Sequence, residues 1–396
     1  MNYGKIVIAT DKFKGTLTAE EAASAIKDGI LASFGQSGKT PPEIRNFPMA
    51  DGGEGSLATM KSAIESAGSE YKEVSVPAVN QLGQPVQVPV LLLEKNTAFI
   101  EMASACGLNL IPHDSMDLLH STTYGLGETI RIAIEKYGIR HIMLSIGGSG
   151  TNDGGFGLLT ALGYRFSNSN PFRNKDIPTF LEGIESMMDE GVDMLCPHLK
   201  DTVFKVACDV SNPLLGPDGA SAVYGPQKGA TPEIVGRFEK ALENWADVVE
   251  KWSGADEDDS LFNRYSEGAG AAGGTGFILG SVLKAEMMRG WEFFSGILNL
   301  DKHIAEADLV ITGEGRFDRS SLSGKLPWGI ATLCRKHRKP VWVVTGRNCL
   351  PKEIWRPSGF NEVLSIETTF RSESNIFNRA AELLTKMLSD KFSSIL

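Results

Sequence analysis

Residues 5–10 read KIVIAT, a short β-branched run that indicates a buried strand. A helix is expected directly after it, because Thr18 and Glu21 form a capping-box pair ahead of AEEAASAIKDGILASF. EIRNFPM (43–49) is the next expected strand, and a second helix is expected to start near Gly55. This strand–helix–strand–helix order predicts a parallel sheet.

The C-terminal quarter of the chain resumes the same pattern. Strands are expected at DLVITG (308–313), VWVVTG (341–346) and FNEVLSI (360–366), with helices near 326–336 and 373–390. Both chain ends therefore contribute to one predicted domain, residues 1–65 plus 286–396, with a Rossmann- or flavodoxin-like α/β fold and a parallel sheet.

The middle of the chain has a different pattern. Three strand-like runs come in succession, YKEVSVPAV (71–79), QPVQVPVLLL (84–93) and NTAFIEMA (96–103), with few helical residues between them. Later helices are expected at 123–137, 155–163, 231–251 and 270–288. Later strands are expected at 141–147 and 204–210. We therefore expect an inserted, mixed α/β domain over residues 66–285.

Composition limits the classes of function. The chain has 396 residues, of which 42% are hydrophobic, and this length favours more than one domain. A formal charge of −10 without a basic block argues against nucleic-acid binding. Five cysteines without a CxxC pair indicate reduced thiols and a cytoplasmic protein. The strand expected from Lys5 leaves no room for a signal peptide, and no apolar run is long enough to span a membrane.

Unusual residues follow the predicted strands. The segments after strands are DKFKGT (11–16), ADGGEGS (50–56), GSGTNDGG (148–155), DVSNPLLG (209–216) and EGRFDRSSLSGK (314–325). Ligands of parallel sheets bind outside the carboxyl ends of the strands. Together these segments predict one large active site, in a cleft between the two domains.

The glycine run at 147–150 favours an anion, because backbone N–H groups converge between a strand and a helix start. A flexible turn is the alternative interpretation. The chain has no GxxxxGK[ST] motif. GAGAAGG (268–274) does contain GxGxxG, but the residues before it are polar and do not predict a strand, so an NAD-dependent oxidoreductase rests on this motif alone.

Aspartate and glycine occur together twice, as DGGEG (51–55) and DGGFG (153–157). A carboxylate near phosphates is tolerable with a divalent cation between them, and Mg²⁺ prefers one or two carboxylates plus phosphate oxygens. We therefore expect Asp51 and Asp153 to approach each other around a metal–nucleotide complex. The residues indicate a phosphate-handling enzyme, for which phosphoryl transfer, a phosphatase and a sugar-phosphate isomerase are all open.

The order of eight motifs narrows this class. The motifs are DKFKGTLTAEEAASAI, PMADGGEGS, STTYGLGE, IGGSGTNDGGFGLLTALG, ACDVSNPLLG, GPQKGATPE, GAGAAGG and DLVITGEGRFD. From about residue 5 to residue 346 the chain closely resembles the bacterial type I glycerate kinases, which form 2-phosphoglycerate. The resemblance implies two α/β domains with the site between them, and ATP-dependent phosphorylation of D-glycerate.

Given the resemblance, roles are assigned by charge. The residues expected to hold phosphate oxygens of ATP are Gly147, Gly148, Ser149 and Asn152. The cations expected to neutralise the transferring phosphoryl group are Lys14 and Lys228. The carboxylates expected to carry Mg²⁺ are Asp51, Glu54 and Asp153.

The remaining roles concern the acceptor. The residues expected to bind it are Asp11, Lys12, Glu314 and Arg316, with Arg316 on the glycerate carboxylate because a planar fork matches that group. Asp209 or Asp318 is expected to accept the hydroxyl proton. The chain departs from the family pattern at Lys12, where serine is more usual, and at Ser323, where histidine is frequent. These departures concern substrate contact rather than the reaction.

Other outcomes are kept open. One alternative is a kinase for a related small hydroxy acid, and another is a catalytically inactive regulator that binds the same ligands. We expect a monomer or a homodimer with ATP and D-glycerate as its partners.

Overall fold

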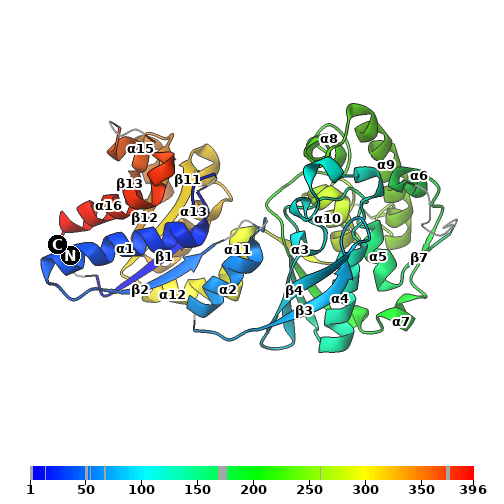
Figure 1. Ribbon diagram of the computed structural model, residues 1–396, viewed down its shortest axis with the longest axis horizontal. Helices are drawn as coiled ribbons and strands as arrows, with labels where there is room; N and C mark the ends of the chain where they lie inside the picture. Colours follow the sequence, from blue (N-terminus) through cyan, green and yellow to red (C-terminus); the bar gives the residue numbers. More distant parts are fainter. Residues whose placement is uncertain are drawn as a thin grey trace. The chain divides into compact units, whose positions relative to one another are not determined.

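The computed structural model describes residues 3–13, 15–49, 52–53, 55–66, 68–167, 176–258, 260–371 and 375–396 (Figure 1). The chain divides into two compact units. Unit 1 comprises Met1–Asp51, Ala58–Glu70 and Arg289–Leu396, and unit 2 comprises Gly52–Leu57 and Tyr71–Met288. The prediction of two α/β domains, one with a parallel sheet and one mixed, is confirmed. The predicted boundaries and the predicted cleft between the domains stay predictions.

Unit 1 is built on a five-stranded sheet in which every pair of neighbouring strands is parallel. In spatial order its strands are β13 (Glu362–Ser365), β12 (Val341–Asn348), β11 (Leu309–Phe317), β1 (Lys5–Thr10) and β2 (Glu43–Pro48). The chain leaves β1 toward β2 on one side and later returns to β11 on the other. This is the flavodoxin-like strand order, and its topological switch point lies between β1 and β11.

Helices cover both faces of this sheet. The helices that lie wholly in unit 1 are α1 (Ala19–Ser37), α11 (Gly290–Ile297), α12 (Leu300–Glu306), α13 (Leu326–His337), α14 (Lys352–Trp355), α15 (Ile366–Thr369) and α16 (Ala380–Ser393). Helix α2 (Ser56–Ser66) begins in unit 2 and continues in unit 1 from Ala58. Figure 1 shows α1 and α16 side by side, with α12 on the opposite face of the sheet. Alternate strand residues such as Ile6 and Ile8 pack under α1 and α16, because successive side chains of a strand point to opposite faces.

Helix α1 forms where the sequence predicts it. The Thr18 hydroxyl accepts from the Glu21 amide at 3.1 Å, and the Glu21 carboxylate accepts from the Thr18 amide at 2.8 Å, so the capping box is present. Ile26, Ile30 and Phe34 recur at four-residue spacing and are fully buried. Their stripe anchors the helix over the sheet, which fixes the position of β1 and the loop after it.

Unit 2 is built on a six-stranded mixed sheet. In spatial order its strands are β10 (Glu286–Met288), β9 (Val203–Ala207), β6 (His141–Ser145), β5 (Thr97–Glu101), β4 (Pro85–Leu93) and β3 (Lys72–Val79). The strands from β5 to β10 are parallel, whereas β3 and β4 are antiparallel to their neighbours. The carboxyl ends of β5, β6, β9 and β10 therefore meet at one edge. A separate two-stranded pair is formed by β7 (Arg165–Phe166) and β8 (Met187–Met188).

The helices of unit 2 share one large hydrophobic core with the sheet. They are α3 (Ala103–Cys106), α4 (Tyr124–Tyr137), α5 (Phe156–Leu162), α6 (Ile177–Glu182), α7 (Val192–Leu195), α8 (Ala220–Tyr224), α9 (Pro232–Ser253) and α10 (Ala271–Ser281). Trp245 of α9 is fully buried, and its indole N–H donates to the Gly154 carbonyl at 2.9 Å. The long helix α9 thus holds the loop that precedes α5.

The helix expected over 270–288 is wrong at both ends, because the backbone of residues 272–274 is left-handed and the helix stops well before residue 288. Helix α10 ends at Ser281, and residues 286–288 form β10, which pairs with β9. Lys284 has φ +52°, a left-handed conformation that interrupts a helix and turns the chain toward the sheet.

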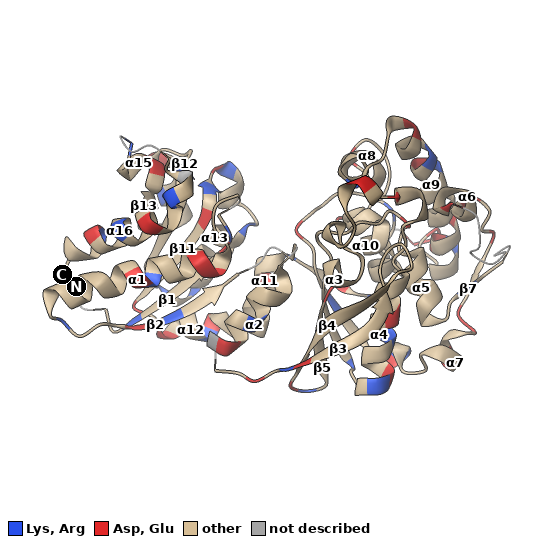
Figure 2. Ribbon diagram, in the orientation of Figure 1, with Lys and Arg blue, Asp and Glu red and all other residues tan. Residues whose placement is uncertain are grey.

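Figure 2 shows Lys and Arg interspersed with Asp and Glu in each unit. Within the described ranges, no helix combines the length and the apolar character that crossing a membrane requires.

Candidate active site

The glycine loop of unit 2 starts directly after β6. The Gly147 amide donates to the Gly52 carbonyl at 2.9 Å, and a Cβ at position 147 would lie 2.5 Å from the Gly53 Cα. Gly52 also lies against Ala207, the last residue of β9. The first DGG segment therefore meets the start of the second glycine loop at the carboxyl ends of β6 and β9, and only glycine allows this backbone approach.

Lys228 lies beneath this loop. Its side chain is 3% exposed, and its Nζ donates to the Ser149 hydroxyl at 3.0 Å and to the Thr151 carbonyl at 2.6 Å. Burial lowers the pKa of Lys228 to about 8, and the charges of Cys106 and Asp153 act against that lowering. A lysine ammonium carries three N–H donors, so one remains after these two bonds.

Asp153 has a different environment from the one expected. Its carboxylate is fully buried and accepts from the amides of Thr123, Gly155 and Gly157 at 2.8–3.1 Å, and from the hydroxyls of Thr122 and Thr123. Burial raises the pKa of the Asp153 carboxyl, and the backbone donors act in the opposite sense. These five donors hold together the starts of α4 and α5, and they leave little room for a metal ion on this carboxylate.

Asn152 is also fully buried. Its Nδ2 donates to the Ser221 hydroxyl at 2.9 Å, so the amide supports the loop from behind. Among the described groups, its Oδ1 and the Thr151 Oγ1 have no hydrogen-bond partner. Of the four predicted nucleotide-binding residues, Gly147 and Gly148 are half-buried, while Ser149 and Asn152 are buried.

The GAGAAGG segment packs against this loop from the other side. The Gly154 amide donates to the Gly273 carbonyl at 3.0 Å, and a Cβ at Gly273 would lie 2.1 Å from the Thr151 carbonyl oxygen. Residues 261–268 contain no strand, so the context of a dinucleotide-binding motif is absent from this described stretch. The small residues serve close packing.

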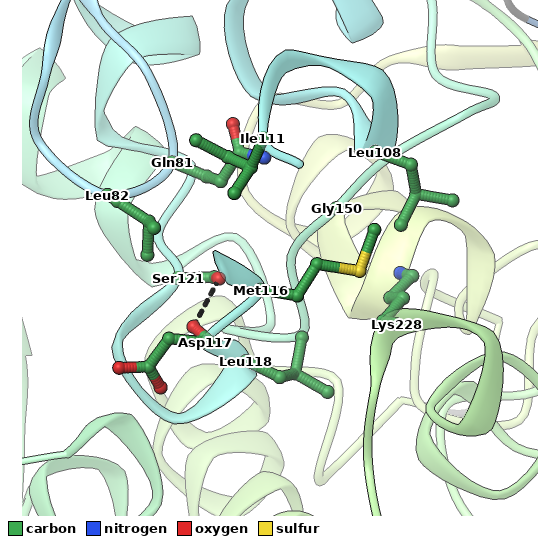
Figure 3. A pocket seen from close by; sticks show the side chains of 10 residues that line it. All are labelled: Gln81, Leu82, Leu108, Ile111, Met116, Asp117, Leu118, Ser121, Gly150 and Lys228. Carbon is green, nitrogen blue, oxygen red and sulfur yellow. Dashed lines mark hydrogen bonds between the residues drawn. The ribbon is translucent and has the colours of Figure 1, made fainter. Parts of the chain in front are cut away.

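A pocket lies beside Lys228 (Figure 3). It is a small, open pocket with a cavity volume of about 10 Å³, and its lining mixes aliphatic side chains such as Ile111 and Met116 with the polar side chains of Asp117, Ser121 and Lys228. Lys228 and Leu108 lie on the side of the pocket opposite Leu82.

Unit 1 carries its candidate residues at the switch point. The Asp11 amide donates to the Gly313 carbonyl at 2.9 Å, and the Lys12 amide donates to Asp11 Oδ1 at 2.7 Å. Glu314 and Arg316 continue β11 beyond Gly313. The four predicted substrate-binding residues therefore come from the ends of two adjacent parallel strands, where sheets of this order bind ligands.

Glu314 is a buried carboxylate, 8% exposed. One carboxyl oxygen is hydrogen-bonded by the Ser321 side chain, whereas Oε1 has no partner among the described groups. Burial raises the pKa of Glu314 to about 7, the Ser321 bond and the Lys325 charge act against this, and Asp318 adds to it. The group therefore changes charge near neutral pH.

Arg316 and Asp318 lie nearer the surface. The Arg316 side chain is 66% exposed, and its Nε is 3.5 Å from Asp318 Oδ2. Asp318 caps the short 3₁₀ helix Arg319–Leu322, accepting from the Ser320 amide at 2.9 Å and from its hydroxyl at 2.6 Å. The Ser320 hydroxyl bond is the main reason that the pKa of Asp318 is lowered, which makes Asp318 a weaker proton acceptor.

Of the four remaining predicted site residues, the structure describes only one. Lys14, Asp51 and Glu54 lie outside the described residues. Asp209 is exposed just beyond β9. Within the described ranges, no group of three or more His, Cys, Asp or Glu side chains could hold a metal ion.

The threonines that bind Asp153 were not among the predicted site residues. Thr122 and Thr123 stand directly before α4 in STTYGLGE, a motif that received no role. Threonines at a helix start commonly cap it, which is the signal that could have drawn attention to them. Ser321, which binds Glu314, was likewise overlooked within a serine-rich loop.

The fold and these two clusters define an α/β enzyme that handles phosphate, with a glycine loop over a buried lysine in one unit and charged strand ends in the other. Comparison with known proteins narrows the class. The model of the glycerate kinase family matches residues 6–395. The chain belongs to the glycerate kinase family and is therefore a phosphotransferase, as predicted.

Relatives cover the chain nearly end to end. It is 38% identical to "Glycerate 2-kinase" of Escherichia coli (strain K12), over 95% of this chain and 94% of that protein. It is 37% identical to "Glycerate kinase" of Bacillus subtilis (strain 168), over 99% and 97%. A crystal structure of a protein provisionally assigned as glycerate kinase 2 from Salmonella typhimurium LT2 matches with a TM-score of 0.79 and 36% identity, over 100% and 98% of the two chains.

Proposed function

We propose that this enzyme transfers the γ-phosphoryl group of ATP to a hydroxyl group of D-glycerate and forms 2-phosphoglycerate. The name of the E. coli relative supports the position of transfer, because that protein is called a 2-kinase. The family supports the acceptor.

The observation that carries the proposal is the charged cluster at the switch point of unit 1. A small hydroxy acid needs a cation for its carboxylate and polar groups for its hydroxyls. Arg316 offers an exposed guanidinium, whose planar fork fits a carboxylate. Asp11, Lys12 and Glu314 supply carboxylates and an ammonium from the two adjacent strand ends.

The nucleotide is assigned to unit 2. Backbone amides of the glycine loop after β6 would hold phosphate oxygens, and Lys228 would supply positive charge from beneath. Because Lys228 is held by Ser149 and Thr151, its charge is already positioned before any phosphate binds.

Fewer carboxylates remain as candidate Mg²⁺ ligands than the sequence suggested. Asp153 is fully buried and already accepts five hydrogen bonds, four at Oδ2 and one at Oδ1, which argues against a magnesium ion on this carboxylate. Mg²⁺ usually takes one or two carboxylates and otherwise phosphate oxygens and water. Asp51 and Glu54 therefore remain as the proposed Mg²⁺ ligands, and the metal would enter the site as the Mg-ATP complex.

The test is a single-turnover reaction with Mg-ATP and D-glycerate, followed by separation of 2- from 3-phosphoglycerate. Formation of 2-phosphoglycerate with one ADP per product supports the proposal. No ADP would favour the inactive regulator, and faster turnover of another hydroxy acid would favour the alternative acceptor.

We also propose a cytoplasmic location, supported by five cysteines that are all unbridged.

A further inference from the structure

Two buried oxygen atoms on β11 have no hydrogen-bond partner among the described groups. They are Thr312 Oγ1 and Glu314 Oε1, in residues that are 0% and 8% exposed. Residues two apart on a strand point to the same face of the sheet. Burying polar atoms without partners costs free energy, and such atoms in a native structure indicate a missing partner. Both residues lie on β11, one of the two strands that border the switch point, so a ligand bound there would supply the missing partner.

We propose that Glu314 is the catalytic base, with Oε1 accepting the proton of the acceptor hydroxyl. The inference rests on the proposed function. As the hydroxyl oxygen forms its bond to the γ-phosphorus, the O–H proton passes to Glu314. The bond between the γ-phosphorus and the β,γ-bridging oxygen breaks, and its electron pair leaves with ADP. The carboxylic acid then returns the proton to solvent.

The two bases expected from the sequence fit this role less well. The Asp318 carboxylate is committed as a cap, bonded to the amide and hydroxyl of Ser320. Asp209 is exposed beyond β9, where water competes for its oxygens. A general base works best when it is held within reach of one proton and shielded from water, and burial gives Glu314 that shielding.

The surroundings of Glu314 hold it in place. The Ser321 side chain binds its carboxyl group, and the Ser321 hydroxyl in turn accepts from the Asp318 amide at 2.9 Å. The backbone amide of Asp318 therefore helps to orient Ser321, while the Asp318 carboxylate fixes the same turn by accepting from Ser320. The charged groups that act on the carboxyl are Lys325, which favours its ionised form, and Asp318, which opposes it. Together with burial they set a pKa of about 7, close to the pH at which a base must be ionised.

Glu314→Gln is the direct test, because glutamine keeps the shape and a hydrogen-bonding oxygen but cannot take the proton. We expect kcat for ADP formation to fall at least about 100-fold, the usual contribution of a general base. The KM for D-glycerate should change less than about threefold, because ground-state contacts remain. Asp318→Asn should lower kcat less than about tenfold, since asparagine also caps.

The matched control is Glu239→Gln in unit 2. Glu239 also has a raised pKa and one oxygen without a described partner, but its other carboxyl oxygen accepts from the Gly216 amide and no role is proposed for it. Its kcat should equal the wild-type value. Retention of more than about a tenth of kcat in Glu314→Gln overturns the proposal, as does a larger loss in Asp318→Asn than in Glu314→Gln.

A wild-type measurement covers the case in which Glu314→Gln does not fold. At saturating Mg-ATP, kcat/KM for D-glycerate should fall about tenfold per pH unit below a pH near 7. A flat profile between about pH 5.5 and 8 overturns the proposal. Wild-type enzyme that makes no ADP at any pH overturns the proposed function itself, which separates the two failures.

Discussion

The amide nitrogen of Asp11 lies 2.9 Å from the carbonyl oxygen of Gly313, so the end of β1 lies directly beside the segment that carries Glu314 and Arg316. Parallel register brings this about, because Thr10 is the partner of Gly313 in the sheet. Residues from opposite ends of the chain thus form one charged cluster at the switch point. The acceptor half of the proposed reaction depends on this cluster.

Replacing Arg316 tests the proposed carboxylate contact. Arg316→Ala should raise the KM for D-glycerate by about 10–100-fold, since a charge-assisted hydrogen-bonded pair contributes about 1.5–3 kcal/mol. Arg316→Lys should recover only part of the loss, because an ammonium lacks the planar fork. Arg319→Ala, an exposed arginine of the same loop, is the control. An equal increase in the KM for D-glycerate in both variants would mean that the overall positive charge of the loop, and not a specific contact of Arg316, is responsible.

Removing the charge of Lys228 tests its role toward the phosphoryl group. Lys228→Met keeps most of the buried stem but loses the ammonium, and we expect kcat to fall by at least about 100-fold. Steady-state kinetics at saturating substrates measure this directly. A kcat within about threefold of wild type would leave Lys228 only a structural role beneath Ser149 and Thr151.

The lowered pKa of Lys228 also predicts that the free energy of unfolding depends on pH. Its pKa of about 8 in the folded protein lies below the ordinary 10.5. Between these values the unfolded chain binds more protons, so stability rises with pH. From about pH 8 to 10.5, wild type should gain up to about 3 kcal/mol relative to Lys228→Met, at about 1.4 kcal/mol per pKa unit. Urea unfolding of both proteins at the two pH values measures this difference, and a constant difference would contradict the expectation.

Substitutions of Asp153 and Asp51 should distinguish a structural role from a role in Mg²⁺ binding. Asp153→Asn removes a buried charge that five donors surround, and we expect a loss of about 2–4 kcal/mol in the free energy of unfolding. Its half-saturating Mg²⁺ concentration should match wild type. In Asp51→Asn that concentration should rise at least about tenfold with little change in stability. The reverse pattern in Mg²⁺ titrations would restore Asp153 as the ligand.

A substitution of Gly147 tests the contact between residue 147 and residues 52–53. An added Cβ would lie 2.5 Å from Gly53 Cα and 2.7 Å from the Gly52 carbonyl oxygen, so Gly147→Ala must displace backbone. We expect a loss of about 1–3 kcal/mol in stability and reduced activity. Gly236→Ala is the control, because Gly236 lies inside α9 with no atom within 4 Å of an added Cβ. That variant should gain about 0.5–1 kcal/mol.

Local patterns predicted much of the fold. KIVIAT forms β1 and the Thr18–Glu21 pair caps α1, because these signals lie within a few residues of the chain. Strand β10 was missed because three residues are too few to show a period, and it exists only through its pairing with β9. The helix expected there followed from the small apolar residues before it.

For the candidate site, the sequence predicted which strand ends carry charged residues but not the surroundings of individual side chains. Asp11 and Glu314 do follow adjacent strand positions, because Thr10 pairs with Gly313. That they form the active site stays a prediction. The surroundings of Asp153 could not be read from sequence, because its donors include Thr123, thirty residues earlier. The burial that distinguishes Glu314 from Asp318 depends on packing in the same way. Whether Asp51 approaches Asp153 stays a prediction, as Asp51 lies outside the described residues.

The central claim is tested most directly by ³¹P NMR of a single turnover with wild-type enzyme, Mg-ATP and D-glycerate. We expect one equivalent of ADP and a product resonance that matches authentic 2-phosphoglycerate. A resonance that matches 3-phosphoglycerate would contradict the proposed position of transfer, and unchanged ATP would contradict the proposed reaction.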